Sequence, residues 1–122
     1  MVRSVACGKG AMVKIPDRGD IIFISFDPTK GHEQAGSRPA FVVSPLAFNA
    51  KTKTLWACPI TNTQRGWAFE VSLDGNGTQT TGAIRTDQLK TLDFHARQYR
   101  FVEQVPLAIV QEVLAKIKAV LD

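Results

Sequence analysis

The sequence predicts a mainly β domain, a small and strongly bent antiparallel barrel, with one C-terminal helix. Short runs rich in β-branched and aromatic residues recur along the first 102 residues, and such runs are typical of strands. Turn-forming residues separate them, above all DGNG at 74–77. From Pro106 onward, the spacing of apolar residues changes to that of a helix.

The first half of the chain contains three predicted strands. IIFISF at 21–26 and AFVVS at 40–44 are apolar and rich in β-branched residues. LWACPI at 55–60 is the third. We expect this strand at an edge of the sheet, or to stop early, because Pro59 has no N–H to donate to a neighbouring strand.

The second half begins with AFEVSL at 68–73, in which apolar and polar residues alternate. Alternation predicts a half-buried strand with Phe69, Val71 and Leu73 on its buried side. One or two further strands are expected between residues 82 and 92, and a last short strand at residues 99–102.

The C-terminal segment reads as an amphipathic helix. Apolar residues recur at helical spacing from Val110 to Leu121, and Pro106 suits the first turn. This apolar stripe, together with several aromatic residues on a short chain, leaves apolar surface to cover. We therefore expect a homodimer.

Composition limits the class of protein. The 122 residues and 13.4 kDa suit one domain with its own core. No apolar run is long enough to span a membrane, the first seventeen residues lack the apolar region of a secretory signal, and two cysteines favour a reduced chain. We therefore expect a cytoplasmic protein. A net charge of +4 favours binding to polyanions such as nucleic acid.

The longest polar segment is DPTKGHEQAGSRP at 27–39, between the first two predicted strands. Thirteen residues are too many for a tight hairpin, and loops of this length are often functional. Its two glycines allow it to fold over a bound molecule. We expect the loop to bring His32, Glu33 and Arg38 to the rim of a groove.

Five motifs occur in an order and spacing that resemble a known family. They are RGDIIFISFDPTKGHEQAGSRPAFVVSP from residue 18, PIT at 59–61, FEVSLDG at 69–75, TTGAIRTDQ at 80–88 and KTLDFHAR at 90–97. Together they resemble the MazF/PemK (Kid) family of bacterial toxin ribonucleases. The resemblance covers residues 18–122 as a single toxin domain. Residues 1–17 precede it, and we expect this extension to be dispensable.

The resemblance implies a fold and an activity. The fold would be an SH3-like barrel with a terminal helix, assembled as a homodimer. The activity would be that of a metal-independent endoribonuclease without a cofactor, which cuts single-stranded mRNA at short sequences and so inhibits translation and growth. A labile, acidic antitoxin would bind the basic surface. Two histidines without ligand-like spacing also argue against a structural metal.

The same resemblance implies two sets of catalytic residues, and this chain contains both. The Kid branch of the family implies His32, Arg85 and Asp87. The MazF branch implies Arg38 and Thr61, with Glu33 nearby. Presence alone therefore does not rank the two sets.

A further group of residues is expected to bind RNA rather than to react. These candidates are Glu33, Gln34, Thr61, Phe69 and Thr81. Phe69 and its neighbour Trp67 suit base stacking, although core packing explains Phe69 equally well. His95 is a minor option, as the partner of His32 in an acid–base pair.

Chemistry suggests a role for each catalytic candidate. Arg85 and Asp87 are two residues apart in a predicted strand, so their side chains should share one face. Asp87 suits the base that takes the 2′-hydroxyl proton, and His32 suits the acid. Arg85 and Arg38 suit phosphate clamps, because an arginine rarely gives up its proton. Without the resemblance, an Arg85–Asp87 surface ion pair would be the simpler interpretation.

Two non-enzymatic alternatives stay open on the residues alone. A gyrase-binding toxin of the CcdB type uses the same barrel, but it needs aromatic C-terminal residues where this chain has AVLD. A plain RNA-binding module with an SH3-like barrel is the other alternative. If the chain is a ribonuclease that uses the 2′-hydroxyl, its products are a 2′,3′-cyclic phosphate and a free 5′-hydroxyl.

Overall fold

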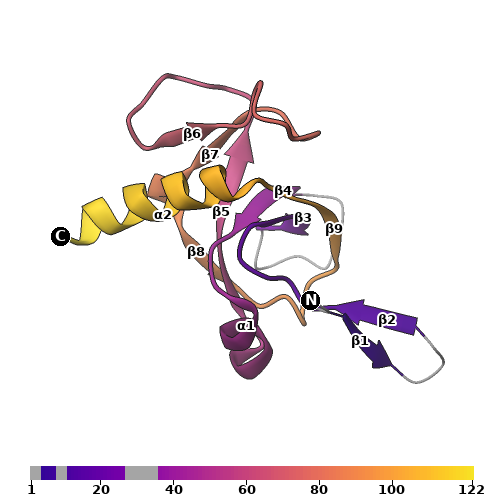
Figure 1. Cartoon of the computed structure of the whole chain (residues 1–122). Helices are drawn as coiled ribbons and strands as arrows, with labels where there is room; N and C mark the ends of the chain where they lie inside the picture. The colour runs from indigo at the N-terminus through magenta and orange to yellow at the C-terminus, as the bar shows by residue number, and fades with distance from the viewer. Residues whose placement is uncertain (1–3, 8–10, 27–35) are drawn as a thin grey trace.

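The computed structural model describes residues 4–7, 11–26 and 36–122. Most of these residues belong to a seven-stranded antiparallel sheet and to the C-terminal helix α2 (Leu107–Leu121), as Figure 1 shows. The strands of the sheet are β3 (Asp20–Ser25), β4 (Ser37–Val42), β5 (Leu55–Thr61), β6 (Glu70–Ser72), β7 (Ala83–Arg85), β8 (Lys90–Leu92) and β9 (Tyr99–Gln104). The predicted mainly β fold with a terminal helix is confirmed.

The sheet does not close into a complete barrel. Its strand order is β6-β7-β5-β4-β3-β9, and β8 pairs with β5 outside this path. Among the described residues, β6 and β9 lie at the two ends of the order and form no ladder with each other. The sheet is therefore open.

Alternation along the strands gives the sheet two apolar faces. On one face, Phe41, Ile84 and Val71 pack with Val110 and Val113 of α2. On the other face, a second cluster forms around Ile22, Ile24, Ala40, Val42, Leu55, Ala57, Leu92 and Phe94. Only the first half of α2 is buried, since Leu121 is 79% exposed and the helix projects beyond the sheet in Figure 1.

The prediction that Pro59 marks an edge or a strand end is wrong. β5 is a central strand with β4 on one side, where Ala40 is opposite Pro59. On the other side it pairs first with β8, through residues 55–57, and then with β7, through residues 60 and 61. Pro59 falls in the gap between these two ladders, where a missing N–H interrupts no ladder hydrogen bond.

The predicted pattern of the 68–73 strand is also partly wrong. Val71 and Leu73 are buried as expected, but Phe69 is 41% exposed and Glu70 is buried. The strand begins only at Glu70, so the alternation does not extend to Phe69. Glu70 is tolerated inside because backbone N–H groups donate to its carboxylate.

One helix and two strands have no counterpart in the sequence prediction. Helix α1 (Leu46–Thr52) follows β4 and is anchored by the buried Asn49, whose amide donates to the carbonyl oxygens of Pro16 at 2.8 Å and Ser44 at 3.1 Å. Seven residues are too few for a clear apolar stripe, so tertiary contacts specify this helix. Strands β1 (Ser4–Cys7) and β2 (Ala11–Lys14) form a separate two-stranded ladder.

Candidate functional site

The sheet register brings Arg38, Thr61 and Arg85 to one face. Thr61 on β5 is opposite Ala83 on β7, and Arg85 follows two residues later. Arg38 on β4 and Thr61 each lie two residues beyond the pair formed by Ala40 and Pro59. Opposite residues, and residues two apart on a strand, point to the same side. Since Ala40 belongs to the apolar cluster away from α2, all three candidates lie on the face opposite α2.

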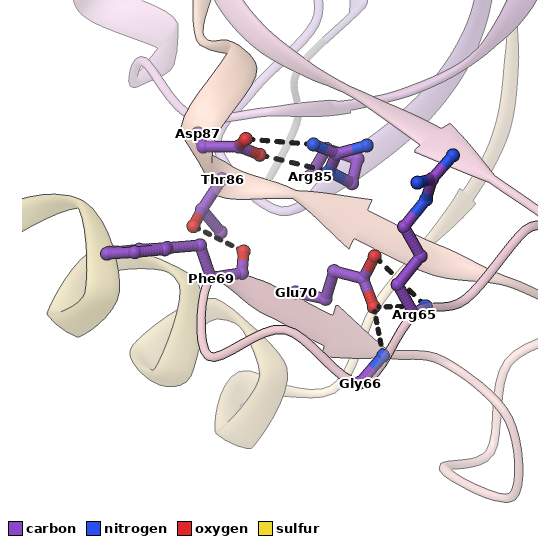
Figure 2. A network of polar contacts seen from close by, with 7 residues as sticks. All are labelled: Arg65, Gly66, Phe69, Glu70, Arg85, Thr86 and Asp87. Carbon is purple, nitrogen blue, oxygen red and sulfur yellow. Dashed lines mark hydrogen bonds and ion pairs between the residues drawn. The ribbon is translucent and has the colours of Figure 1, made fainter.

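Two contacts hold the Arg85 side chain in place. Its Nε and Nη2 groups donate to the two carboxylate oxygens of Asp87 at 3.0 and 2.8 Å, as Figure 2 shows. Its guanidinium carbon also lies 4.7 Å from the centre of the Trp67 ring. The edge of the guanidinium is thus held by a bidentate pair and its plane by an aromatic ring. The Nη1 amino group lies outside the bidentate pair.

The Arg85–Asp87 pair changes both pKa values. The hydrogen bond between the two side chains raises the pKa of Arg85 and lowers the pKa of Asp87. In this arrangement Asp87 is a weaker base than a free carboxylate. Asp87 contacts Arg85, but not because both residues lie on one face of a strand, as predicted. Asp87 lies on the 3₁₀ turn η1 (Thr86–Gln88), after the strand has ended at Arg85.

Glu70 connects this pair to the preceding loop. It is opposite Arg85 in the β6–β7 ladder, and its buried carboxylate accepts hydrogen bonds from the backbone N–H groups of Arg65 at 3.0 Å and Gly66 at 3.1 Å (Figure 2). Sequence reasoning missed this residue because alternation placed it on the outward side of a strand.

The MazF-branch candidates, Arg38 and Thr61, lie near the start of β4 and at the end of β5. The exposed Arg38 guanidinium lies 5.9 Å from the centre of the Phe26 ring. The Thr61 hydroxyl accepts a hydrogen bond from the backbone N–H of Thr63 at 3.1 Å. Gly82 packs closely against Thr61: it has a φ of +107°, and a Cβ there would lie 2.4 Å from the Thr61 carbonyl oxygen.

Comparison with known proteins identifies the relatives of this chain. The family described as "PemK-like, MazF-like toxin of type II toxin-antitoxin system" matches residues 17–121. The chain belongs to this family. It is 45% identical over 108 residues to endoribonuclease PemK of Escherichia coli, covering 86% of this chain and 81% of that protein.

Solved structures of the family share the fold. MazF from Deinococcus radiodurans superposes with a TM-score of 0.79 at 35% identity, over 89% of this chain and 98% of that one. A MazE–MazF structure from the same organism gives a TM-score of 0.77 at 30% identity, over 89% and 97% of the two chains. The predicted resemblance to the MazF/PemK family is thereby confirmed.

Three of the family-derived candidates lie outside the described residues. They are His32, Glu33 and Gln34. The described part of the Kid-branch set therefore consists of Arg85 and Asp87, which contact each other. The described MazF-branch residues, Arg38 and Thr61, lie on the same sheet face as Arg85.

The remaining described candidates are Phe69, Thr81 and His95. Phe69 is exposed, and its carbonyl oxygen accepts hydrogen bonds from the backbone N–H and hydroxyl of Thr86. The Thr81 hydroxyl donates to the Asn62 side chain at 3.2 Å, next to Thr61. His95 lies on the turn between β8 and β9, with its ring 4.7 Å from that of Phe94.

Three further observations concern metals, cysteine and membranes. Within the described ranges, no group of three or more His, Cys, Asp or Glu residues is arranged to hold a metal ion. Cys58 is a buried free thiol, and burial, assisted by the charge of Asp87, raises its pKa to about 12. In the same part of the chain, no helix is long and apolar enough to cross a membrane.

Proposed function

We propose that this chain is the endoribonuclease of a type II toxin–antitoxin system and that it cleaves single-stranded RNA without a metal. The observation that supports this most directly is the common face of Arg38, Thr61 and Arg85, with the Arg85 guanidinium already oriented by Asp87 and Trp67. The name of the related PemK, endoribonuclease, agrees with it.

The proposed reaction is an attack of the ribose 2′-oxygen on the neighbouring phosphorus. The bond from the 2′-oxygen to phosphorus forms and the bond from phosphorus to the 5′-oxygen breaks. A base accepts the 2′ proton, and an acid gives a proton to the leaving 5′-oxygen. The internal nucleophile is already beside the phosphorus, which reduces the entropic cost of the step. The guanidinium groups stabilise the charge that develops on the phosphate oxygens.

The ion pair suggests how Asp87 acts as the base. While Asp87 is paired with Arg85, its lowered pKa makes it a poor proton acceptor. A bound phosphate competes for the same guanidinium, since arginine forms bidentate contacts with phosphate as with carboxylate. Release from Arg85 raises the proton affinity of Asp87 at the moment when the substrate is in place. His32 suits the acid by residue type, and Thr61 suits a donor to a phosphate oxygen.

The proposed partners follow from the family and from charge. A net charge of +4 suits an acidic antitoxin whose extended tail folds on this surface, and a MazF relative has been solved together with MazE. We also propose a homodimer in the cytoplasm, so that two equivalent sites line one groove. Light scattering at micromolar concentration should give the mass of two chains, and a monomer would contradict this.

Cleavage of a mixed-sequence RNA in EDTA tests the function. We expect the RNA to be shortened, and we expect polynucleotide kinase to label the new 5′ ends without prior phosphatase treatment. Replacing the nucleotide before the mapped cut by its 2′-deoxy form should abolish cleavage there. Cleavage of the 2′-deoxy substrate at the normal rate would overturn the mechanism. If the RNA stayed intact, the proposal of an enzyme would be wrong and a non-enzymatic binding protein would be favoured.

A further inference from the structure

Trp67 is a large aromatic residue that the fold keeps exposed beside two positive charges. Its side chain is 46% exposed. The guanidinium carbon of Arg85 lies 4.7 Å from the centre of its ring, and that of Arg65 lies 5.2 Å away. By contrast, Phe23 and Phe26 each lie beside one arginine among the described residues. An exposed aromatic ring beside cationic groups is the pattern that single-strand nucleic-acid binders use.

The loop that presents Trp67 is anchored on both sides of it. Before it, the buried Glu70 carboxylate holds the backbone N–H groups of Arg65 and Gly66. After it, the Ala68 carbonyl oxygen accepts a hydrogen bond from Lys116 of α2. The neighbouring Phe69 carbonyl oxygen accepts from Thr86, as Figure 2 shows. The ring is therefore exposed because its backbone is fixed there, and not because the segment lacks contacts.

We propose that the exposed indole of Trp67 is the stacking surface for one nucleobase of single-stranded RNA, next to the phosphate held by Arg85. This inference rests on the proposed ribonuclease function, whose phosphate site it adjoins. Arg65, on the same ring, would contact the phosphate of the flanking nucleotide. Every nucleobase offers an aromatic face, so stacking accepts any base. Trp67 thus helps to place a phosphate at Arg85 whatever the stacked base is, while other residues select the sequence.

The decisive test combines a protein variant with RNAs that lack one base. Cleavage of a defined RNA by wild type and Trp67→Ala is compared with cleavage of the same RNA carrying an abasic nucleotide at each position near the cut. We expect Trp67→Ala to lower kcat/KM by about 5- to 150-fold. At one position, an abasic nucleotide should lower the kcat/KM of wild type by a similar factor. The same RNA should lower the kcat/KM of Trp67→Ala hardly at all, because the variant already lacks the stacking contact.

Trp56 offers a matched control. It is 43% exposed, and its ring contacts Phe48 edge-on rather than an arginine. Trp56→Ala should cleave all of these RNAs within about twofold of wild type. Trp67→Phe should recover part of the lost activity, because a smaller aromatic ring still stacks. Circular dichroism and thermal melting of each variant establish that it is folded.

Tryptophan fluorescence gives a readout that does not depend on cleavage. The chain has two tryptophans, so Trp56→Phe leaves Trp67 as the only one, and Trp67→Phe leaves Trp56. Mixed-sequence single-stranded DNA, which has no 2′-hydroxyl to react, is titrated into both variants. We expect quenching when Trp67 is the reporter and no change when Trp56 is the reporter.

The outcomes separate this inference from the proposed function. If RNA is not cut but Trp67 is quenched, the ribonuclease proposal fails and the stacking site stands. If RNA is cut, Trp67 is not quenched and Trp67→Ala loses the same factor on every abasic RNA, the stacking site is overturned. Wild-type activity of a folded Trp67→Ala would overturn it equally.

Discussion

The two tryptophans lie in regions of equal exposure and different chemistry. Trp56 and Trp67 are 43% and 46% exposed. Trp56 lies in β5 and contacts the ring of Phe48 on α1, with ring centres 5.7 Å apart. Trp67 lies in a loop and contacts two arginines, one of which is paired with Asp87. Exposure of an aromatic ring therefore does not identify a binding site, whereas the charged groups around the ring do.

The largest effect expected from this difference is that of Arg85→Ala. Removing the oriented guanidinium should lower kcat for RNA cleavage by about 10²-fold or more, the usual effect of losing one positioned group that stabilises charge in the transition state. Single-turnover cleavage of a defined RNA measures this. Arg100→Ala is the matched control, since Arg100 also lies 5.3 Å from an aromatic ring, that of Phe23, but has no such carboxylate pair among the contacts described here. Equal losses in the two variants would show that general basic charge, and not this site, supports cleavage.

The strands and the helix could be predicted because their apolar patterns extend over enough residues to be recognised. The β3, β4, β5 and β9 runs and α2 all appear where expected, within a few residues. Two of the misses, α1 and Glu70, share one physical cause, which is that a tertiary contact outweighs a local pattern. Helix α1 depends on Asn49. Glu70 is buried because the loop before it donates two N–H groups to it.

The candidate site was predictable only in part. Arg38, Thr61, Arg85 and Asp87 came from resemblance to a family, and the register explains why they belong together. The local argument for Arg85 and Asp87 assumed one continuous strand, whereas the chain turns into η1 after Arg85. No sequence pattern shows that Arg65 and Arg85 both contact Trp67, because these contacts depend on how the 62–69 loop lies relative to β7.

A second prediction tests how the Trp67 region is held in place. Glu70→Ala removes the acceptor for the N–H groups of Arg65 and Gly66, so the protein should lose about 1–3 kcal/mol of unfolding free energy. Trypsin should also cut native protein faster after Arg65, because the loop opens locally. Asp122→Ala is the control, since Asp122 is an exposed acidic residue at the end of α2. An unchanged cleavage rate after Arg65 would show that Glu70 does not hold the loop.

A smaller, pH-dependent effect is expected from Asp87→Asn. The Asp87 pKa is lowered in the folded protein by its hydrogen bond with Arg85. The pair therefore stabilises the fold above the ordinary pKa of an aspartate, about 3.9, and loses this contribution as the pH falls through the lowered folded pKa. Because the pair is partly exposed, the difference in unfolding free energy between wild type and variant should be at most about 1 kcal/mol at pH 7.

Thermal melting of wild type and Asp87→Asn from pH 7 to pH 2 measures that difference. The melting temperatures of the two proteins should become equal only in the most acidic samples. A gap that instead closed between pH 6 and pH 7 would mean that Asp87 has a raised pKa, and the ion-pair account of the site would be wrong. RNA cleavage by the same variant should fall by about 10²-fold or more, because an asparagine side chain cannot accept the 2′ proton.

The smallest effect is expected from removing the N-terminal strand β1. Strands β1 and β2 pair with each other in a two-stranded sheet, and the ladders described here join neither of them to the seven-stranded sheet. The family match begins at residue 17, after both strands. Deleting residues 1–11 should therefore leave RNA cleavage within about twofold of wild type, and should leave quenching of Trp67 by single-stranded DNA unchanged. If cleavage were lost while the melting temperature stayed the same, the N-terminal residues would form an arm that binds RNA. The basic surface around Trp67 would then be only part of the binding groove.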